Sequence, residues 1–164
     1  MSLSKRDLKL ADLFARPSNF FAFGFGSGLV PYAPGTAGTI VGVPIVVLFG
    51  QSGDVMLLLT TALFFVAGIW ICRHAAEYLE VHDHGGIVWD EIVGFMVCMC
   101  FIPITWNSML VGFLLFRFFD VMKPWPIRVV DRKVSGGFGI MLDDVIAGVF
   151  ANVLLQLLVR ANWL

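Results

Sequence analysis

The chain has 164 residues, of which 59% are hydrophobic and only 14% are charged, and its mean hydropathy is +0.87. Soluble domains carry about a quarter charged residues, so this composition excludes an ordinary water-soluble protein. The net charge of −1 gives no basis for binding nucleic acid. The length suits one domain, and we expect a single membrane-embedded unit over residues 1–164.

Residues 1–16 are expected to form an amphipathic segment at the membrane surface. Five charged residues fall within the first dozen, interspersed with leucines. Such a pattern is typical of a helix lying in the interface plane. An ordinary surface helix or a frayed tail is the alternative.

About five hydrophobic segments follow and predict an all-α, polytopic helical bundle. They lie near residues 37–52, 55–72, 88–103, 106–121 and 142–160. The segment at 55–72 has 18 uncharged residues, enough to span a membrane. Residues 20–36 are rich in glycine and proline and could either span or re-enter.

The uncharged run at 92–116 has two interpretations, one long crossing or a hairpin that turns at 102–108. Pro103 breaks a helix, and Trp106 favours a membrane interface. With a cytoplasmic N-terminus, the hairpin places ten of the eleven basic residues inside and leaves only Arg160 outside. The positive-inside rule expects this distribution, so we predict the hairpin.

With this topology, charged residues gather at the cytoplasmic ends of the last three segments. They are Asp90 and Glu91, then Arg117, Asp120 and Lys123, and finally Asp143 and Asp144. A charge at the centre of a membrane helix costs about 2.5–3.5 kcal/mol, and burial at its end also has a cost. Basic side chains or a bound cation must compensate, and carboxylates without nitrogen ligands suit Mg²⁺. Ion pairs within one helix, or acids complementing helix N-termini, are the simpler alternatives.

The stretch PYAPGTAGTI is predicted to open a helix with Gly35, Thr36 and Thr39 in its first turns. Backbone N–H groups and hydroxyls at such a terminus can bind a phosphate. Small residues for close helix packing are the competing interpretation. Arg128 follows the break made by KPWP and is a further candidate for phosphate binding.

Four stretches resemble the bacterial phosphatidylglycerophosphatase A family. They are GFGSGLVPYAPGTAGT, HDHGGIVWDEIVGF, FRFFDVMKPWPIRVVDR and GGFGIMLDDVIAGV. The resemblance covers about residues 20–150. It implies a Mg²⁺-dependent phosphatase of the inner membrane that converts phosphatidylglycerol phosphate to phosphatidylglycerol and inorganic phosphate. Its site would face the cytoplasm.

The mechanism we predict distributes roles among these residues. Asp90, Glu91, Asp120, Asp143 and Asp144 would be Mg²⁺ ligands and a general base for the attacking water. Arg117, Lys123 and Arg128 would offset the charge of the phosphate. Gly35, Thr36 and Thr39 of the glycine-rich helix would donate hydrogen bonds to the substrate.

Attack by an aspartate on phosphorus is the alternative mechanism. Among other functions, a CDP-alcohol transferase is disfavoured because its D-G-x-x-A-R pattern is absent. A transporter would need charges at mid-bilayer depth, and a structural adaptor leaves the clustered acids unexplained. The oligomeric state is not predicted.

Overall fold

The computed structural model describes residues 8–81 and 84–164, and within these residues it contains helices and no strand. The predicted all-α class is therefore confirmed for the described chain. The elements are α1 (Leu10–Ala15), α2 (Pro17–Ala22), the 3-10 helix η1 (Gly24–Leu29), α3 (Pro34–Gly50), α4 (Asp54–Leu79), α5 (Trp89–Met99), α6 (Trp106–Met122), α7 (Ile127–Lys133) and α8 (Gly136–Arg160).

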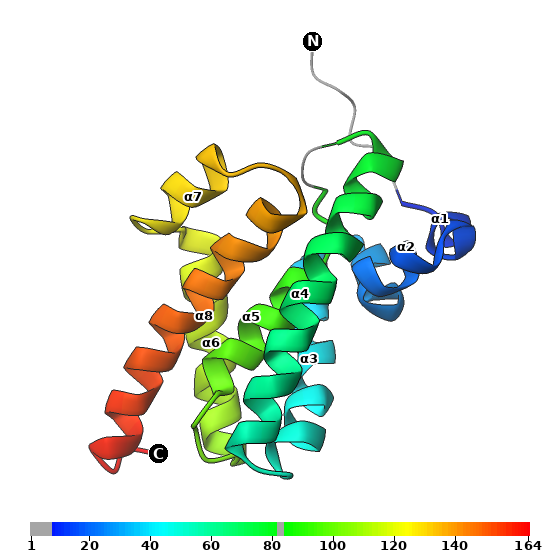
Figure 1. Ribbon diagram of the computed structural model, residues 1–164. Coiled ribbons are helices and arrows are strands. Elements are labelled where there is room, and N and C mark those ends of the chain that lie inside the picture. The colour runs from blue at the N-terminus through cyan, green and yellow to red at the C-terminus, as the bar shows by residue number, and fades with distance from the viewer. Residues whose placement is uncertain (1–7, 82–83) are drawn as a thin grey trace.

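The short helix α5 is the centre of the bundle. It packs against α3, α4, α6 and α8 (Figure 1), and nine of its eleven residues are buried. Ile92, Phe95 and Met96 are fully enclosed. The helix α7 lies across one end of the bundle, next to the start of α8. That end also carries the starts of α3 and α5 and the end of α6.

Two helices, α4 and α8, are long and apolar enough to span a membrane, and α3 is a shorter apolar helix. A line of large apolar residues on α4 faces away from the protein, each more than half exposed: Val55, Leu59, Leu63, Val66 and Trp70. Lipid is the natural cover for such a surface. The eleven residues of α5 rise only about 16 Å, against about 30 Å of hydrocarbon. The segment predicted at 88–103 is thus shorter than expected.

The predicted hairpin is confirmed. The helix α5 ends at Met99 and α6 begins at Trp106. Thr105 caps α6 by accepting a hydrogen bond from the backbone N–H of Ser108 at 3.1 Å. The side-chain amide of Asn152 on α8 donates to the carbonyls of Cys98 and Cys100, both at 2.8 Å. The last carbonyls of α5 therefore have partners although they are buried.

Glycines allow the helices around α5 to approach closely. A Cβ placed on Gly148 of α8 would overlap the carbonyl oxygen of Gly94 on α5. On α3, a Cβ on Gly38 would lie 2.6 Å from that of Val88, and one on Gly42 would lie 3.3 Å from the Phe95 ring. Gly38 and Gly42 therefore fit the packing interpretation of the glycine-rich stretch.

The structure describes only part of the predicted amphipathic segment at residues 1–16, because residues 1–7 lie outside the described part of the chain. Within α1, Leu10 and Phe14 are exposed, whereas Asp12 is buried and accepts a 2.9 Å hydrogen bond from the Tyr78 hydroxyl of α4. Leu10 and Phe14 thus face away from the protein, whereas Leu13 is buried in the core. This arrangement fits the predicted membrane surface.

The contact between α5 and α8 predicts a large effect of a small substitution. Gly148→Val should lower the thermal midpoint by roughly 5 °C, because overpacking costs about 1–3 kcal/mol. The matched control is Gly85→Val, since nothing lies within 4 Å of a Cβ at Gly85. Circular dichroism of the two detergent-solubilised variants measures both thermal midpoints. Equal midpoints would contradict the close packing.

Candidate active site

The first turn of α5 carries two adjacent acids, Asp90 and Glu91. Trp89 anchors this turn, because its indole N–H donates to the carbonyl of Phe64 on α4 at 3.1 Å. Asp90 is buried, and the side chain of Glu91 is only 14% exposed. Both carboxylates therefore lie inside the bundle, at its charged end.

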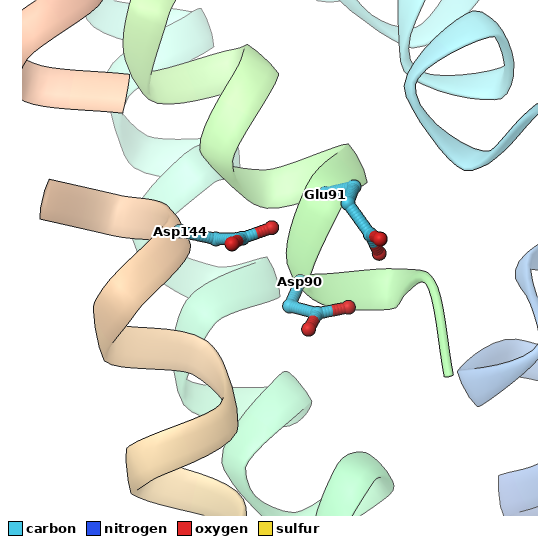
Figure 2. Close-up of side chains that lie close together, drawn as sticks. All are labelled: Asp90, Glu91 and Asp144. Carbon is cyan, nitrogen blue, oxygen red and sulfur yellow. The ribbon is translucent and has the colours of Figure 1, made fainter. Parts of the chain in front are cut away.

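Asp144 of α8 completes a three-carboxylate cluster with Asp90 and Glu91. One oxygen from each residue lies within 4.8 Å of the other two. Figure 2 shows Asp144 directed from α8 toward the first turn of α5. Among the described residues, Glu91 Oε2 and Asp144 Oδ2 are buried and have no hydrogen-bond partner. All the donor atoms of this cluster are oxygens, and two of them have no hydrogen-bond partner among the described residues. The cluster therefore fits a hard divalent cation.

The predicted start of the last helix was wrong. It was placed at residue 142, but α8 begins at Gly136, so Asp143 and Asp144 lie about 11 Å along the helix and not at its N-terminus. One glycine before them, Gly137, is a contact position inside the helix. A Cβ on Gly137 would overlap the carbonyl oxygen of Ile69 on α4. The two acids therefore do not serve as N-terminal acids that complement the helix dipole.

Arg117 connects α6 to the cluster. Its Nη1 lies 2.5 Å from Asp120 Oδ2 and 3.9 Å from Glu91 Oε1. Asp120 is nearly buried, and its charge also acts on Asp144. Arg117 and Asp120 thus form the ion pair within one helix that was the simpler alternative, and Arg117 also lies close to Glu91. The contact with Glu91 confirms that the hairpin brings its two charged ends together.

The first turn of α3 reaches the same place through Gly35. A Cβ on this residue would overlap the Glu91 carboxylate and would lie 3.0 Å from Arg117 Nη1. Glycine therefore allows this approach without displacing the ends of the Glu91 and Arg117 side chains. Thr36 is partly exposed, and the Thr39 hydroxyl donates to the Gly35 carbonyl at 2.9 Å. The hydroxyl proton of Thr39 therefore forms a hydrogen bond within α3.

Lys123, at the end of α6, forms a second charged group beside the cluster. Its Nζ lies 2.5 Å from Asp143 Oδ2 and 2.6 Å from Asp131 Oδ1 of α7. Burial acts to lower the pKa of Lys123, but the ion pairs with these carboxylates outweigh it and raise the pKa above its usual range. The side chain is therefore an ammonium at neutral pH.

The five acids predicted as one metal-binding set thus take three positions. Asp90, Glu91 and Asp144 gather together, Asp120 pairs with Arg117, and Asp143 pairs with Lys123. Sequence reasoning missed Asp131, because it lies eight residues after Lys123 and two prolines interrupt the helix between them. Arg128 is exposed, and its guanidinium donates to the Met122 carbonyl at 3.5 Å.

Comparison with known proteins identifies the family. The model of the family described as phosphatidylglycerophosphatase A matches residues 20–159. The chain belongs to the phosphatidylglycerophosphatase A family. A relative of that name from Haemophilus influenzae is 47% identical over 142 residues, which cover 84% of this chain and 85% of the relative. One from Escherichia coli is 40% identical over 150 residues, covering 91% and 85%. No solved structure matches the chain.

Membership of the phosphatidylglycerophosphatase A family makes the chain a phosphatase. Every charged residue of the site lies within the span that the family model matches. A phosphatase must bind an anion and stabilise the charge of its transition state. The arrangement of a buried oxygen cluster beside Arg117 provides both a place for a cation and a cationic side chain.

The ion pairs of Lys123 make a prediction about stability. Lys123→Gln leaves the buried Asp143 carboxylate without its ammonium, and breaking a buried pair is strongly destabilising. Because Lys123 is a quarter exposed, we expect a loss of about 2 kcal/mol, or roughly 5 °C in thermal midpoint. Arg128→Gln is the control, since Arg128 forms no ion pair among the described residues and donates to a backbone carbonyl. A midpoint unchanged in both variants would contradict the pairing.

Proposed function

We propose that this enzyme hydrolyses phosphatidylglycerol phosphate to phosphatidylglycerol and inorganic phosphate, with Mg²⁺ as its cofactor. The observation that carries the proposal is the buried cluster of Asp90, Glu91 and Asp144, with Arg117 beside it, at the charged end of an apolar bundle. Relatives named phosphatidylglycerophosphatase A support the substrate.

Asp90, Glu91 and Asp144 would hold the Mg²⁺. This ion takes one or two carboxylates together with phosphate oxygens of a substrate, and two of the cluster's buried oxygens have no hydrogen-bond partner among the described residues. When bound, the ion would offset the negative charge of the phosphate and lower the pKa of a bound water.

The remaining side chains would act on the phosphate and on the attacking water. Arg117 already lies between Asp120 and Glu91, so its guanidinium can turn toward a phosphate oxygen. Asp120 would take the proton of the water as that water's oxygen bonds to phosphorus. The bond from phosphorus to the glycerol oxygen breaks, the leaving oxygen takes a proton from solvent water, and Asp120 then returns its own proton to the solvent. Lys123 would help to balance the charge that grows on this oxygen.

The start of α3 would supply a further contact to the phosphate. Because Gly35 has no Cβ, the backbone of this helix N-terminus comes directly against Glu91 and Arg117. Unpaired N–H groups at a helix N-terminus attract anions. Thr36, one residue later and partly exposed, would contribute its hydroxyl.

We further propose a multi-pass enzyme of the bacterial inner membrane, with its site facing the cytoplasm. The end of α6 and the basic helix α7 lie at one end of the bundle, whereas α8, which finishes at Arg160, ends at the other (Figure 1). This asymmetry follows the positive-inside rule. The recessed acids then lie at headgroup depth, where a lipid presents its terminal phosphate.

Phosphate release from phosphatidylglycerol phosphate in detergent micelles tests the proposal. We expect release with Mg²⁺ and none with EDTA, and Asp144→Asn should reduce kcat by about 100-fold or more. The control Asp54→Asn removes an equally charged but exposed acid at the start of α4. It should retain full activity.

Two results would contradict this proposal. If well-folded wild-type protein with Mg²⁺ releases no phosphate, the substrate is wrong. If Asp144→Asn and Asp54→Asn are equally active, the enzyme stands but its site lies elsewhere.

A further inference from the structure

A cavity of about 400 Å³ lies at the corner between α6 and α7. Four basic side chains and one tryptophan line it: Lys123, Arg128, Arg132, Lys133 and Trp125. No carboxylate is among the described residues that line the cavity. The cavity is therefore strongly cationic.

Among the described residues, three of these cations have no counter-charge. In the described part of the chain, Arg128, Arg132 and Lys133 take part in no ion pair, whereas Lys123 is held by Asp131 and Asp143. Like charges that converge on one cavity repel each other, and an anion relieves this repulsion. The arginine fork suits phosphate oxygens in particular.

The rim of the cavity is apolar and faces outward. Of the residues that line it, Trp125 is 80% exposed and Val129 is 37% exposed. Tryptophan favours the membrane–water interface, and basic side chains around it extend toward lipid headgroups. A ligand with a phosphate next to apolar chains matches both the lining and the rim.

The cavity is also connected to the catalytic cluster. Lys123 lines the cavity and binds Asp143, the chain neighbour of Asp144. One molecule with two phosphate groups could therefore occupy both places. Phosphatidylglycerol phosphate is such a molecule: a glycerol unit separates its phosphodiester, which carries the diacylglycerol, from its terminal phosphomonoester.

We propose that this cavity binds the phosphodiester of the lipid substrate while the phosphomonoester occupies the acidic cluster. The inference rests on the proposed function. The assignment follows from charge, because the monoester has nearly two negative charges and suits a divalent cation, whereas the singly charged diester suits arginine and lysine donors. The cavity then favours lipids that have a diester in addition to the reacting phosphate.

The double variant Arg132→Gln/Lys133→Gln tests this site by steady-state kinetics in micelles. We expect the KM for phosphatidylglycerol phosphate to rise about tenfold while kcat is retained. Inhibition by short-chain phosphatidylglycerol, which has only the diester, should weaken similarly. Inhibition by inorganic phosphate, which occupies only the cluster, should not change.

Two further variants serve as controls. Arg160→Gln removes the same charge at the far end of α8 and should leave the KM unchanged. Arg132→Lys/Lys133→Arg keeps both charges and should preserve most of the affinity. Circular dichroism establishes that each variant is folded.

Other outcomes would overturn either the proposed function or the inference about the cavity. A wild-type enzyme without activity on phosphatidylglycerol phosphate overturns the proposed function. An active enzyme whose KM is unchanged in the double variant overturns the inference, as does equal weakening of inhibition by inorganic phosphate. If short-chain phosphatidylglycerol activates the wild type instead of inhibiting it, and the double variant loses this activation, the cavity binds a separate anionic lipid and not the substrate.

Discussion

The burial of carboxylates in an apolar bundle is the constraint on which the rest of the structure depends. Asp144 lies well inside α8, and its partners Asp90 and Glu91 lie in the first turn of the buried helix α5. Carboxylates in such surroundings repel each other and lose hydration. Arg117 offsets part of this charge, and the remaining oxygens fit a cation. A fold without a function for these acids would gain stability by replacing them with apolar residues.

The packing of the helices serves this cluster directly. Gly94 and Gly148 let α5 and α8 approach until Asp144 faces Glu91, and Gly35 brings the start of α3 against the same carboxylate. Asn152 binds the last carbonyls of α5, so this helix can end after only eleven residues inside the bundle. The short α5 and the early start of α8 place the acids below the charged end and not on its surface. In the proposed membrane orientation, this is the level of a lipid phosphate at headgroup depth.

Much of this arrangement could be predicted from the sequence, because charge asymmetry and proline positions act locally. The hairpin between α5 and α6 followed from Pro103 and from the distribution of basic residues. The start of α8 was wrong because the charged Asp143 and Asp144 bound the apolar run in the sequence, whereas the helix begins at Gly136 and buries both acids. The pairing of Lys123 with Asp131 was missed because it depends on how α7 folds back. The division of the five acids into three positions likewise depends on tertiary contacts, which spacing along a helix does not contain.

The most direct measurement of the central claim uses Mn²⁺ in place of Mg²⁺ and a non-hydrolysable phosphonate analogue of the substrate. Pulsed electron paramagnetic resonance detects whether a phosphorus nucleus lies next to the bound ion. We predict a phosphorus coupling in the wild-type enzyme, and loss of the bound ion in Asp144→Asn but not in Asp54→Asn. An ion that is still bound beside phosphorus in Asp144→Asn would contradict the assignment of this cluster as the catalytic metal site.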